Sequence, residues 1–179
     1  MKVYFSIRYE GRWHPRASNG GITIHDVGLI DEDGRSFYGE ISDQLSRIDT
    51  VCSTVVNTSI SGKTEHDIRN TLRAWLSAYP KIQFVSDHDS HIQMCLLIDL
   101  YTLDNGEPLI SVCPTCHNIN QDIARYLDIT DSEAYRLDRQ QFILQYAPNI
   151  LIQLQDKMLL NTPSIGRARL TRYIDRIIQ

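Results

Sequence analysis

Apolar positions in the first part of the chain predict three β-strands. Residues 2–7 (KVYFSI) form a short apolar run, and residues 22–30 (ITIHDVGLI) form a second, in which the apolar parity shifts near His25–Asp26. Such a shift is typical of a β-bulge or of a strand buried on both faces. The segment DEDG at 31–34 predicts a hairpin turn, because Asp-Gly tolerates the positive φ angles of such turns. Residues 35–41 then predict the returning strand, so the chain opens on a three-strand antiparallel meander.

Helical periodicity dominates the rest of the chain. Residues 64–78 place Ile68, Leu72 and Leu76 on one face, which is typical of an amphipathic helix. Residues 81–86 predict a strand, and residues 43–60 have a mixed pattern of helix and loop. Further helices are predicted at 90–101, 118–127, 132–146, most of 149–160 and 164–178. Strands followed by a strand embedded among helices predict an α/β protein, with a mixed sheet covered by helices on both faces.

Length and composition are those of one globular domain. The chain has 179 residues, of which 42% are hydrophobic, and this excludes wholesale disorder. No stretch has the roughly 18 uninterrupted apolar residues of a membrane helix, and the N-terminus has no signal-peptide core. We therefore expect a cytoplasmic protein without a membrane partner. In that compartment its four cysteines, Cys52, Cys95, Cys113 and Cys116, are expected to be reduced.

Charge is unevenly distributed along the chain. Residues 1–20 and residues 156–179 each carry a net charge of +3, whereas residues 21–155 carry −10, within a total of −4. One interpretation is ordinary variation along a solvated surface. The other is that the two basic ends meet in space and form a patch that attracts anions, on a body that repels bulk nucleic acid.

Two clusters contain residue types that bind metals. Cys113, Cys116 and His117 have zinc-knuckle spacing, but a second CxxC pair is absent from the sequence, so zinc would need ligands from elsewhere. The alternative is an ordinary loop, and we expect no resident cofactor. Residues 87–91 (DHDSH) lie between a predicted strand and a predicted helix, where they either bind a metal or form an exposed connection that caps the helix. The sequence contains no glycine-rich phosphate loop and no GxSxG or HExxH motif.

Several stretches resemble one protein family. They are KVYF at the N-terminus, VGLIDEDGRSFYGEISD at 27–43, VSD and LLIDLY within 85–101, and CHNINQDIARY at 116–126. Together they resemble the small bacterial and phage 3′–5′ exoribonucleases of the ribonuclease T type, in the DEDD exonuclease superfamily. The resemblance implies a single ribonuclease-H-like domain over residues 1–179. Its mixed central sheet would open on a three-strand meander, with helices on both faces.

The resemblance also implies a two-metal active site, whose ligands this chain lacks. The family has an Asp-x-Glu pair on the first strand, an Asp on a helix, and a His and an Asp near the C-terminus. The corresponding positions here hold Ser6, Arg8, Gln93, Leu160 and Ile165. A two-metal site needs several carboxylates to offset about +4 of metal charge, and Arg8 adds positive charge there instead. We therefore expect a catalytically inactive relative.

The leading hypothesis is that the former active site binds a nucleotide, a nucleic-acid end or another anion without cleaving it. Arg8 favours anion binding because its planar guanidinium can donate parallel hydrogen bonds to phosphate. Trp13 lies in a basic segment, where its ring could stack on a base. The residues expected to contact such a ligand are Ser6, Arg8, Trp13, Gln93, Asn161 and Arg167.

Two other functions stay open. The first is an exonuclease-like scaffold for protein interaction, such as an inhibitor or an adaptor in phage counter-defence. The second is a divergent metal-dependent 3′–5′ exoribonuclease in which Asp26, Asp87 or Asp89 replaces the lost ligands. Because related enzymes often work as dimers, a homodimer is a further alternative.

Overall fold

The computed structural model describes residues 1–10, 23–41, 58–63, 65–87, 90–102, 106, 115–149 and 163–179. Several residues singled out by the sequence lie outside these ranges, as does most of the helix predicted at 149–160. They are Trp13, Cys52, His88, Asp89, Cys113, Leu160 and Asn161.

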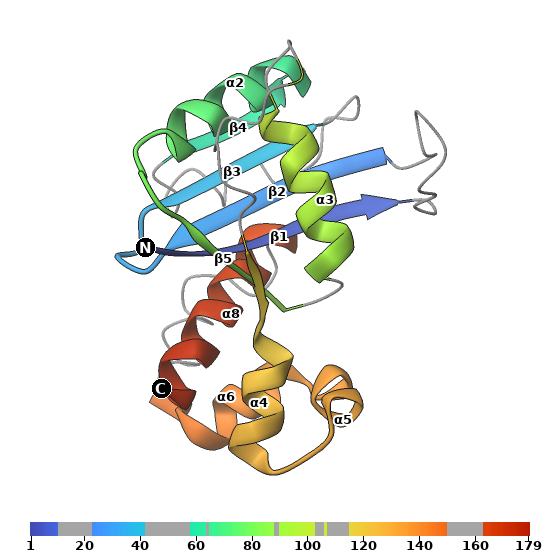
Figure 1. Cartoon of the computed structure of the whole chain (residues 1–179), viewed down its shortest axis with the longest axis vertical. Helices are drawn as coiled ribbons and strands as arrows, with labels where there is room; N and C mark the ends of the chain where they lie inside the picture. Colours follow the sequence, from blue (N-terminus) through green and yellow to red (C-terminus); the bar gives the residue numbers. More distant parts are fainter. Residues whose placement is uncertain are drawn as a thin grey trace.

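A six-stranded mixed sheet forms the centre of the protein, in the order β4-β3-β2-β1-β5-β6 (Figure 1). Its strands are β1 (Lys2–Glu10), β2 (Thr23–Asp31), β3 (Ser36–Ile41), β4 (Thr58–Lys63), β5 (Gln83–Ser86) and β6 (Cys116–Asn118). Strand β2 is antiparallel to both β1 and β3, which confirms the predicted three-strand meander. Strand β5 is parallel to β1, β6 is parallel to β5, and β4 is parallel to β3.

The predicted irregularity in the second strand is a β-bulge. Arg8 of β1 pairs with Asp26, but its neighbour Tyr9 pairs with Ile24, so His25 is the extra residue of β2. Residues that face each other across two antiparallel strands have side chains on the same face. Arg8 therefore lies beside Asp26, at the last regular pair before the bulge. The predicted hairpin turn is also confirmed, with Gly34 at a φ of 99°.

Six helices are described, and most agree with the prediction. They are α2 (Glu65–Leu76), α3 (Ser90–Tyr101), α4 (Ile119–Leu127), α5 (Asp131–Arg136), α6 (Arg139–Tyr146) and α8 (Pro163–Ile178). The single helix predicted at 132–146 was wrong, because it is broken between α5 and α6. Leu137 is the C-cap of α5, and Asp138 caps α6 by accepting hydrogen bonds from the backbone N–H groups of Gln140 and Gln141 at 2.8 and 3.1 Å. Strand β4 at the end of the mixed 43–60 stretch and strand β6 were not predicted.

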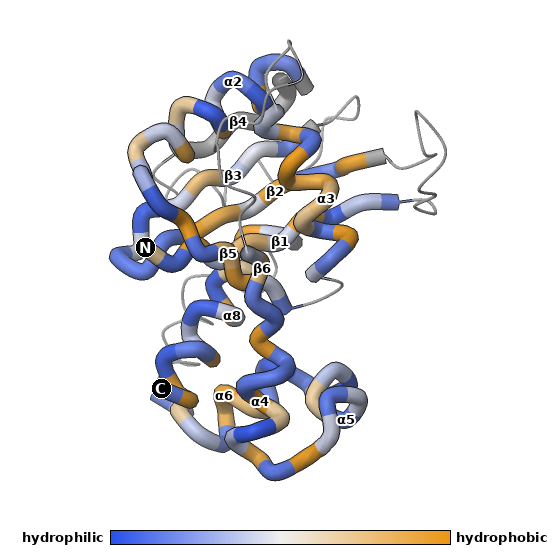
Figure 2. Tube along the Cα trace, in the orientation of Figure 1, coloured by the Kyte–Doolittle hydropathy of each residue, from blue (hydrophilic) through white to orange (hydrophobic). Residues whose placement is uncertain are grey.

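Helices cover both faces of the sheet. Successive side chains of β1 point to opposite faces and are apolar on both, so each face needs a covering layer. Val3, Phe5 and Ile7 point to one face, where they are buried in a core shared with α2 and α3. Tyr4 points to the other face, where α8 packs on β1 and β2 and joins a second core with α4 and α6. Figure 2 shows the apolar stretches concentrated in the central strands and in the helix segments that meet one another. The predicted mixed α/β architecture with helices on both faces is thus confirmed. None of the described helices combines the length and apolar character needed to cross a membrane.

A buried carboxylate holds the β2–β3 hairpin in place. Asp31 is fully buried and accepts hydrogen bonds from the Tyr79 hydroxyl at 2.8 Å, from the Arg35 backbone N–H at 2.8 Å and from Arg35 Nε at 2.9 Å. Burial by itself raises the pKa of Asp31, but the hydrogen bonds from Tyr79 and Arg35 outweigh it and hold the pKa below the ordinary value. Protonation of Asp31 therefore weakens the fold.

We predict that this site makes stability depend on pH in the acid range. Because the folded-state pKa of Asp31 is depressed, its contribution is present above the unfolded-state pKa of about 3.9 and is lost as the pH falls through the folded-state value. Tyr79→Phe removes one donor, so we expect it to lower the free energy of unfolding by about 1 kcal/mol at pH 7 and to flatten the loss below pH 4. Urea unfolding between pH 2.5 and 7 measures both effects. Equal acid dependence in the two proteins would contradict the assignment.

Candidate functional site

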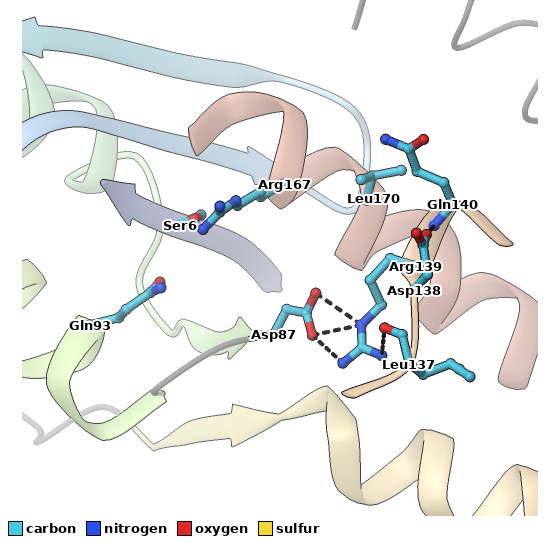
Figure 3. A pocket seen from close by; sticks show the side chains of 9 residues that line it. All are labelled: Ser6, Asp87, Gln93, Leu137, Asp138, Arg139, Gln140, Arg167 and Leu170. Atoms are coloured by element: carbon cyan, nitrogen blue, oxygen red, sulfur yellow. Dashed lines mark hydrogen bonds and ion pairs between the residues drawn. The ribbon is translucent and has the colours of Figure 1, made fainter. Parts of the chain in front are cut away.

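A cavity of about 300 Å³ lies beside strand β1 and the carboxyl end of β5 (Figure 3). It gathers side chains from β1, α3, α8 and the α5–α6 connection. Three of the residues expected to contact a ligand line it, namely Ser6, Gln93 and Arg167. Open α/β sheets commonly bind ligands outside the carboxyl ends of their parallel strands, at the point where the strand order reverses. Strands β1 and β5 meet at such a point.

Gln93 presents a hydrogen-bond donor to this cavity. Its side chain is buried, and its Oε1 accepts a hydrogen bond from the Ile7 backbone N–H and another from the Ser86 hydroxyl, both at 3.3 Å. Two donors on the same oxygen fix the orientation of the amide. Nε2 is consequently the group left for a ligand, and no described residue accepts a hydrogen bond from it.

Arg167 supplies the positive charge of the cavity. It is exposed on the first turns of α8, and its guanidinium forms no ion pair with any carboxylate in the described part of the chain. Ser6, which is buried on β1, adds a hydroxyl. The apolar side chains of Leu137 and Leu170 line the same cavity. The carboxylates of Asp87 and Asp138 line it as well, so cationic, anionic, neutral polar and apolar groups share one small space.

The carboxylate of Asp87 is neutralised at the edge of the cavity. Arg139 Nε lies 2.9 and 3.1 Å from its two oxygens, and Arg139 Nη2 lies 2.7 Å from Oδ1 (Figure 3). The other guanidinium hydrogens reach the carbonyl oxygens of Ala134 and Leu137 and the side-chain oxygen of Asn120. Such a bidentate pair, with every donor satisfied, is a strong structural link. It connects the end of β5 to the helices α4–α6, and it occupies a carboxylate that a metal ion would need.

Arg8 does not line this cavity. Its Nε donates to Oδ2 of Asp26, its cross-strand neighbour on β2. Asp26 is fully buried, and its other oxygen accepts hydrogen bonds from the Ser164 backbone N–H at 3.1 Å and from the Ser164 hydroxyl. The Arg8 guanidinium, which was expected to bind phosphate, therefore links β1 to β2 and, through Asp26, to the start of α8.

Ile165 is buried where α8 touches the sheet. A Cβ built on Gly28 would lie 2.5 Å from Ile165 Cα and 2.7 Å from the Ser164 carbonyl carbon. The helix therefore packs directly on the strand backbone. Of the five positions that the resemblance matches to catalytic residues, Ser6 and Gln93 line the cavity, Arg8 and Ile165 lie outside its lining, and Leu160 is not among the described residues.

Cys116 and His117 do not share a metal site in this structure. They are consecutive residues of β6, so their side chains leave opposite faces of the sheet. Cys116 packs against the core beneath α2 and α3, and His117 Nε2 bonds to Oδ2 of Asp122. Among the described residues, no group of three or more His, Cys, Asp or Glu side chains is arranged to hold a metal ion.

We predict that the Cys116 thiol is unreactive in the native protein. Burial raises the pKa of this thiol to about 12, so almost none of it is thiolate at neutral pH. Alkylation by iodoacetamide at pH 7.5, followed residue by residue with mass spectrometry, should be at least tenfold slower at Cys116 in the folded protein than in urea. Rapid native labelling, or protection that requires added zinc, would contradict this.

Arg139 is the main site residue that sequence reasoning missed. It lay inside the helix predicted at 132–146, where an arginine indicates nothing more than a solvated face. The available signal was Asp138, since aspartate is a favoured N-cap residue and here begins a new helix. That break turns Arg139 toward Asp87, which is 52 positions away in the sequence.

No protein-family model matches the chain, and no curated protein is significantly similar to it in sequence.

Proposed function

We propose that this chain is a non-catalytic protein of the ribonuclease T type that binds a phosphate-bearing ligand, a nucleotide or the end of a nucleic acid, in the cavity beside β1 and β5. One observation carries the proposal. The cavity offers the Arg167 guanidinium, the Gln93 amide nitrogen and the Ser6 hydroxyl as donors. Of its two carboxylates, Asp87 is bound by Arg139, and Asp138 accepts from the backbone N–H groups of Gln140 and Gln141. Donors that lack internal acceptors favour an oxyanion ligand.

The sheet supports the choice of family. A ribonuclease-H-like domain has a three-strand antiparallel meander next to strands parallel to the first one. Strands β3-β2-β1-β5-β6 have this order and these directions here. The cavity adjoins the middle of β1, where Ser6 stands in place of a family carboxylate.

The proposed absence of catalysis is supported by the ion pairs that the carboxylates form. Two of the three aspartates considered as replacement ligands are described, and each is bound to an arginine. Asp26 pairs with Arg8, and Asp87 pairs with Arg139. Two-metal hydrolysis needs free carboxylates that bridge and orient both ions. We therefore propose binding without turnover.

The size and walls of the cavity favour a mononucleotide unit. Its volume of about 300 Å³ is at the lower end of the range for small-molecule sites. Leu137 and Leu170 provide an apolar surface for a sugar or base, and Arg167 provides charge for a phosphate. Since the chain as a whole has a net charge of −4, longer nucleic acid gains little from the remaining surface.

Calorimetric titration with uridine monophosphate and with a short single-stranded RNA tests this function. We expect binding that weakens with salt, and at least a tenfold loss of affinity for Arg167→Gln. The matched control is Arg125→Gln, an exposed arginine on α4 that pairs with Asp122 and is outside this cavity. Equal affinities for the wild type and Arg167→Gln would refute the binding proposal. Degradation of a labelled RNA that needs Mg²⁺ or Mn²⁺ would refute the claim of inactivity.

Protein interaction is a second candidate function, favoured by a different surface. Apart from Met1, the large hydrophobic side chains exposed in the described part all lie on α4–α6: Tyr126, Tyr135, Leu144 and Tyr146. Tyr126 and Tyr146 also stack edge-to-face with ring centroids 5.6 Å apart, above the buried Phe142. Rigid tyrosines are typical anchors of protein interfaces. Pull-down from a nuclease-treated lysate tests this function. A captured protein that is lost with the double variant Tyr126→Ala/Tyr146→Ala would support protein interaction. Capture that depends on nucleic acid would exclude it.

A further inference from the structure

Two arginines of α8 converge on the turn between β2 and β3, away from the cavity. Arg172 and Arg176 are one helical turn apart, and each donates from Nη2 to the carbonyl oxygen of Glu32, at 2.8 and 2.7 Å. Two positive groups therefore share one neutral acceptor. Like charges this close repel each other unless an anion lies between them or water screens them.

The carboxylates around this pair are bound to other donors. Asp31 accepts from Tyr79 and Arg35, and Asp175 accepts from Lys2 Nζ at 2.8 Å. The Glu32 carboxylate accepts from the Lys2 backbone N–H at 3.0 Å. Asp33, in the same turn, is exposed to water. Within the described ranges, no carboxylate forms an ion pair with either Arg172 or Arg176.

Arg172 is the more unusual of the two because it is buried. Only 8% of its surface is exposed, and its Nε has no hydrogen-bond partner among the described residues. Burial, with a further contribution from the charge of Arg176, lowers the pKa of Arg172. A buried guanidinium is ordinarily paired with a carboxylate or another anion, because desolvating an unpaired charge is unfavourable.

The turn packs closely on the Arg172 guanidinium. Gly34 has a φ of 99°, and a Cβ built on it would lie 3.3 Å from Arg172 Nη2 and 3.7 Å from Nη1. A side chain at this position would therefore crowd the guanidinium. Guanidinium groups bind phosphate oxygens through two parallel N–H donors, and two such groups together match a doubly charged anion.

We propose that Arg172 and Arg176 form a second oxyanion site, at the β2–β3 turn, that binds a phosphate group. It is separate from the cavity of the proposed function, to which α8 contributes Arg167 and Leu170 from its first half. Both arginines belong to the basic segment 156–179, so the site assigns a binding role to part of the positive charge of that segment. Phosphate at this position balances the two guanidinium charges and ties α8 to the hairpin.

The test is a titration of the full chain with inorganic phosphate, followed by the Nε–Hε signals of its arginines in NMR spectra. Sodium chloride at equal ionic strength is the reference. We expect saturable shifts of the Arg172 signal with phosphate and not with chloride. Arg176→Gln should weaken binding at least fivefold, and so should Arg172→Lys, which keeps the charge but removes the fork. Arg167→Gln and Arg125→Gln should each change it less than twofold.

The outcomes separate this site from the cavity and identify the source of the phosphate. Unchanged binding in Arg176→Gln, or identical shifts with chloride, would overturn the proposal even if Arg172→Lys failed to fold. Loss of phosphate binding in Arg167→Gln alone would assign the anion to the cavity and likewise overturn it. Equal affinity for inorganic phosphate and uridine monophosphate supports recognition of the phosphate group itself, whereas tighter binding of the ester supports a nucleotide source.

Discussion

Gly28→Ala is expected to destabilise the protein by more than about 3 kcal/mol, beyond the usual range for an overpacked core. A Cβ at this position would lie 2.5 Å from Ile165 Cα and 2.7 Å from the Ser164 carbonyl carbon. Both atoms belong to the backbone of α8, which cannot rotate away as a side chain can. The helix must move off the sheet, and the hydrogen bonds from Ser164 to Asp26 stretch with it. Urea unfolding followed by circular dichroism measures the loss.

Gly39→Ala is the matched control, since it adds the same methyl group to the neighbouring strand. There the new Cβ would meet side-chain atoms, Ile68 Cγ2 at 2.9 Å and the Phe37 ring at 3.2 Å. Side chains can change rotamer, so we expect a smaller loss, about 1–2 kcal/mol. If the two variants were equally stable, direct packing of α8 on the β2 backbone would not be the reason that position 28 needs glycine.

The sequence predicts those parts of this fold that follow from local patterns. The bulge at His25, the turn at Gly34 and the helix at 90–101 each have a signal within a few residues, namely a parity shift, an Asp-Gly pair and an apolar run. Strand β6 has only three residues, Cys116–Asn118, too few for any periodicity. It is a strand because β5 lies beside it. Short strands of this kind are determined by tertiary pairing.

The positions of the candidate site were predictable in part, and its pairings were not. Ser6, Gln93 and Arg167 were expected to meet, and they line one cavity. The partner of Arg8 was not predicted, because it depends on the pairing register of β1 and β2, which sets Asp26 opposite Arg8. Charge on a residue can be read from the sequence, whereas the neutralisation of that charge depends on contacts between residues far apart in the chain. The expectation of a free guanidinium at Arg8 failed for this reason.

Arg8→Met is expected to lower the free energy of unfolding by about 2–4 kcal/mol at pH 7, because it leaves the carboxylate of Asp26 buried without its cation. Asp26 is fully buried, while the Arg8 side chain is 44% exposed, so the two partners are not equivalent. Water can solvate Arg8 when Asp26 is neutralised, but it cannot reach Asp26 when Arg8 is removed. Asp26→Asn, whose amide oxygen still accepts from Ser164, should therefore lose only about 1 kcal/mol.

This asymmetry makes the double variant decisive. Arg8→Met/Asp26→Asn removes the stranded charge, so it should be more stable than Arg8→Met alone by about 1–2 kcal/mol, a rescue that simple loss of packing by the Arg8 stem cannot produce. Arg125→Met, which breaks an exposed pair with Asp122, is the control and should change stability by less than about 0.5 kcal/mol. Additive losses in the double variant would mean that Arg8 and Asp26 act independently. Rescue would mean that the arginine on β1 now neutralises a buried carboxylate, and that its charge is committed to holding α8 on the sheet rather than to binding a ligand.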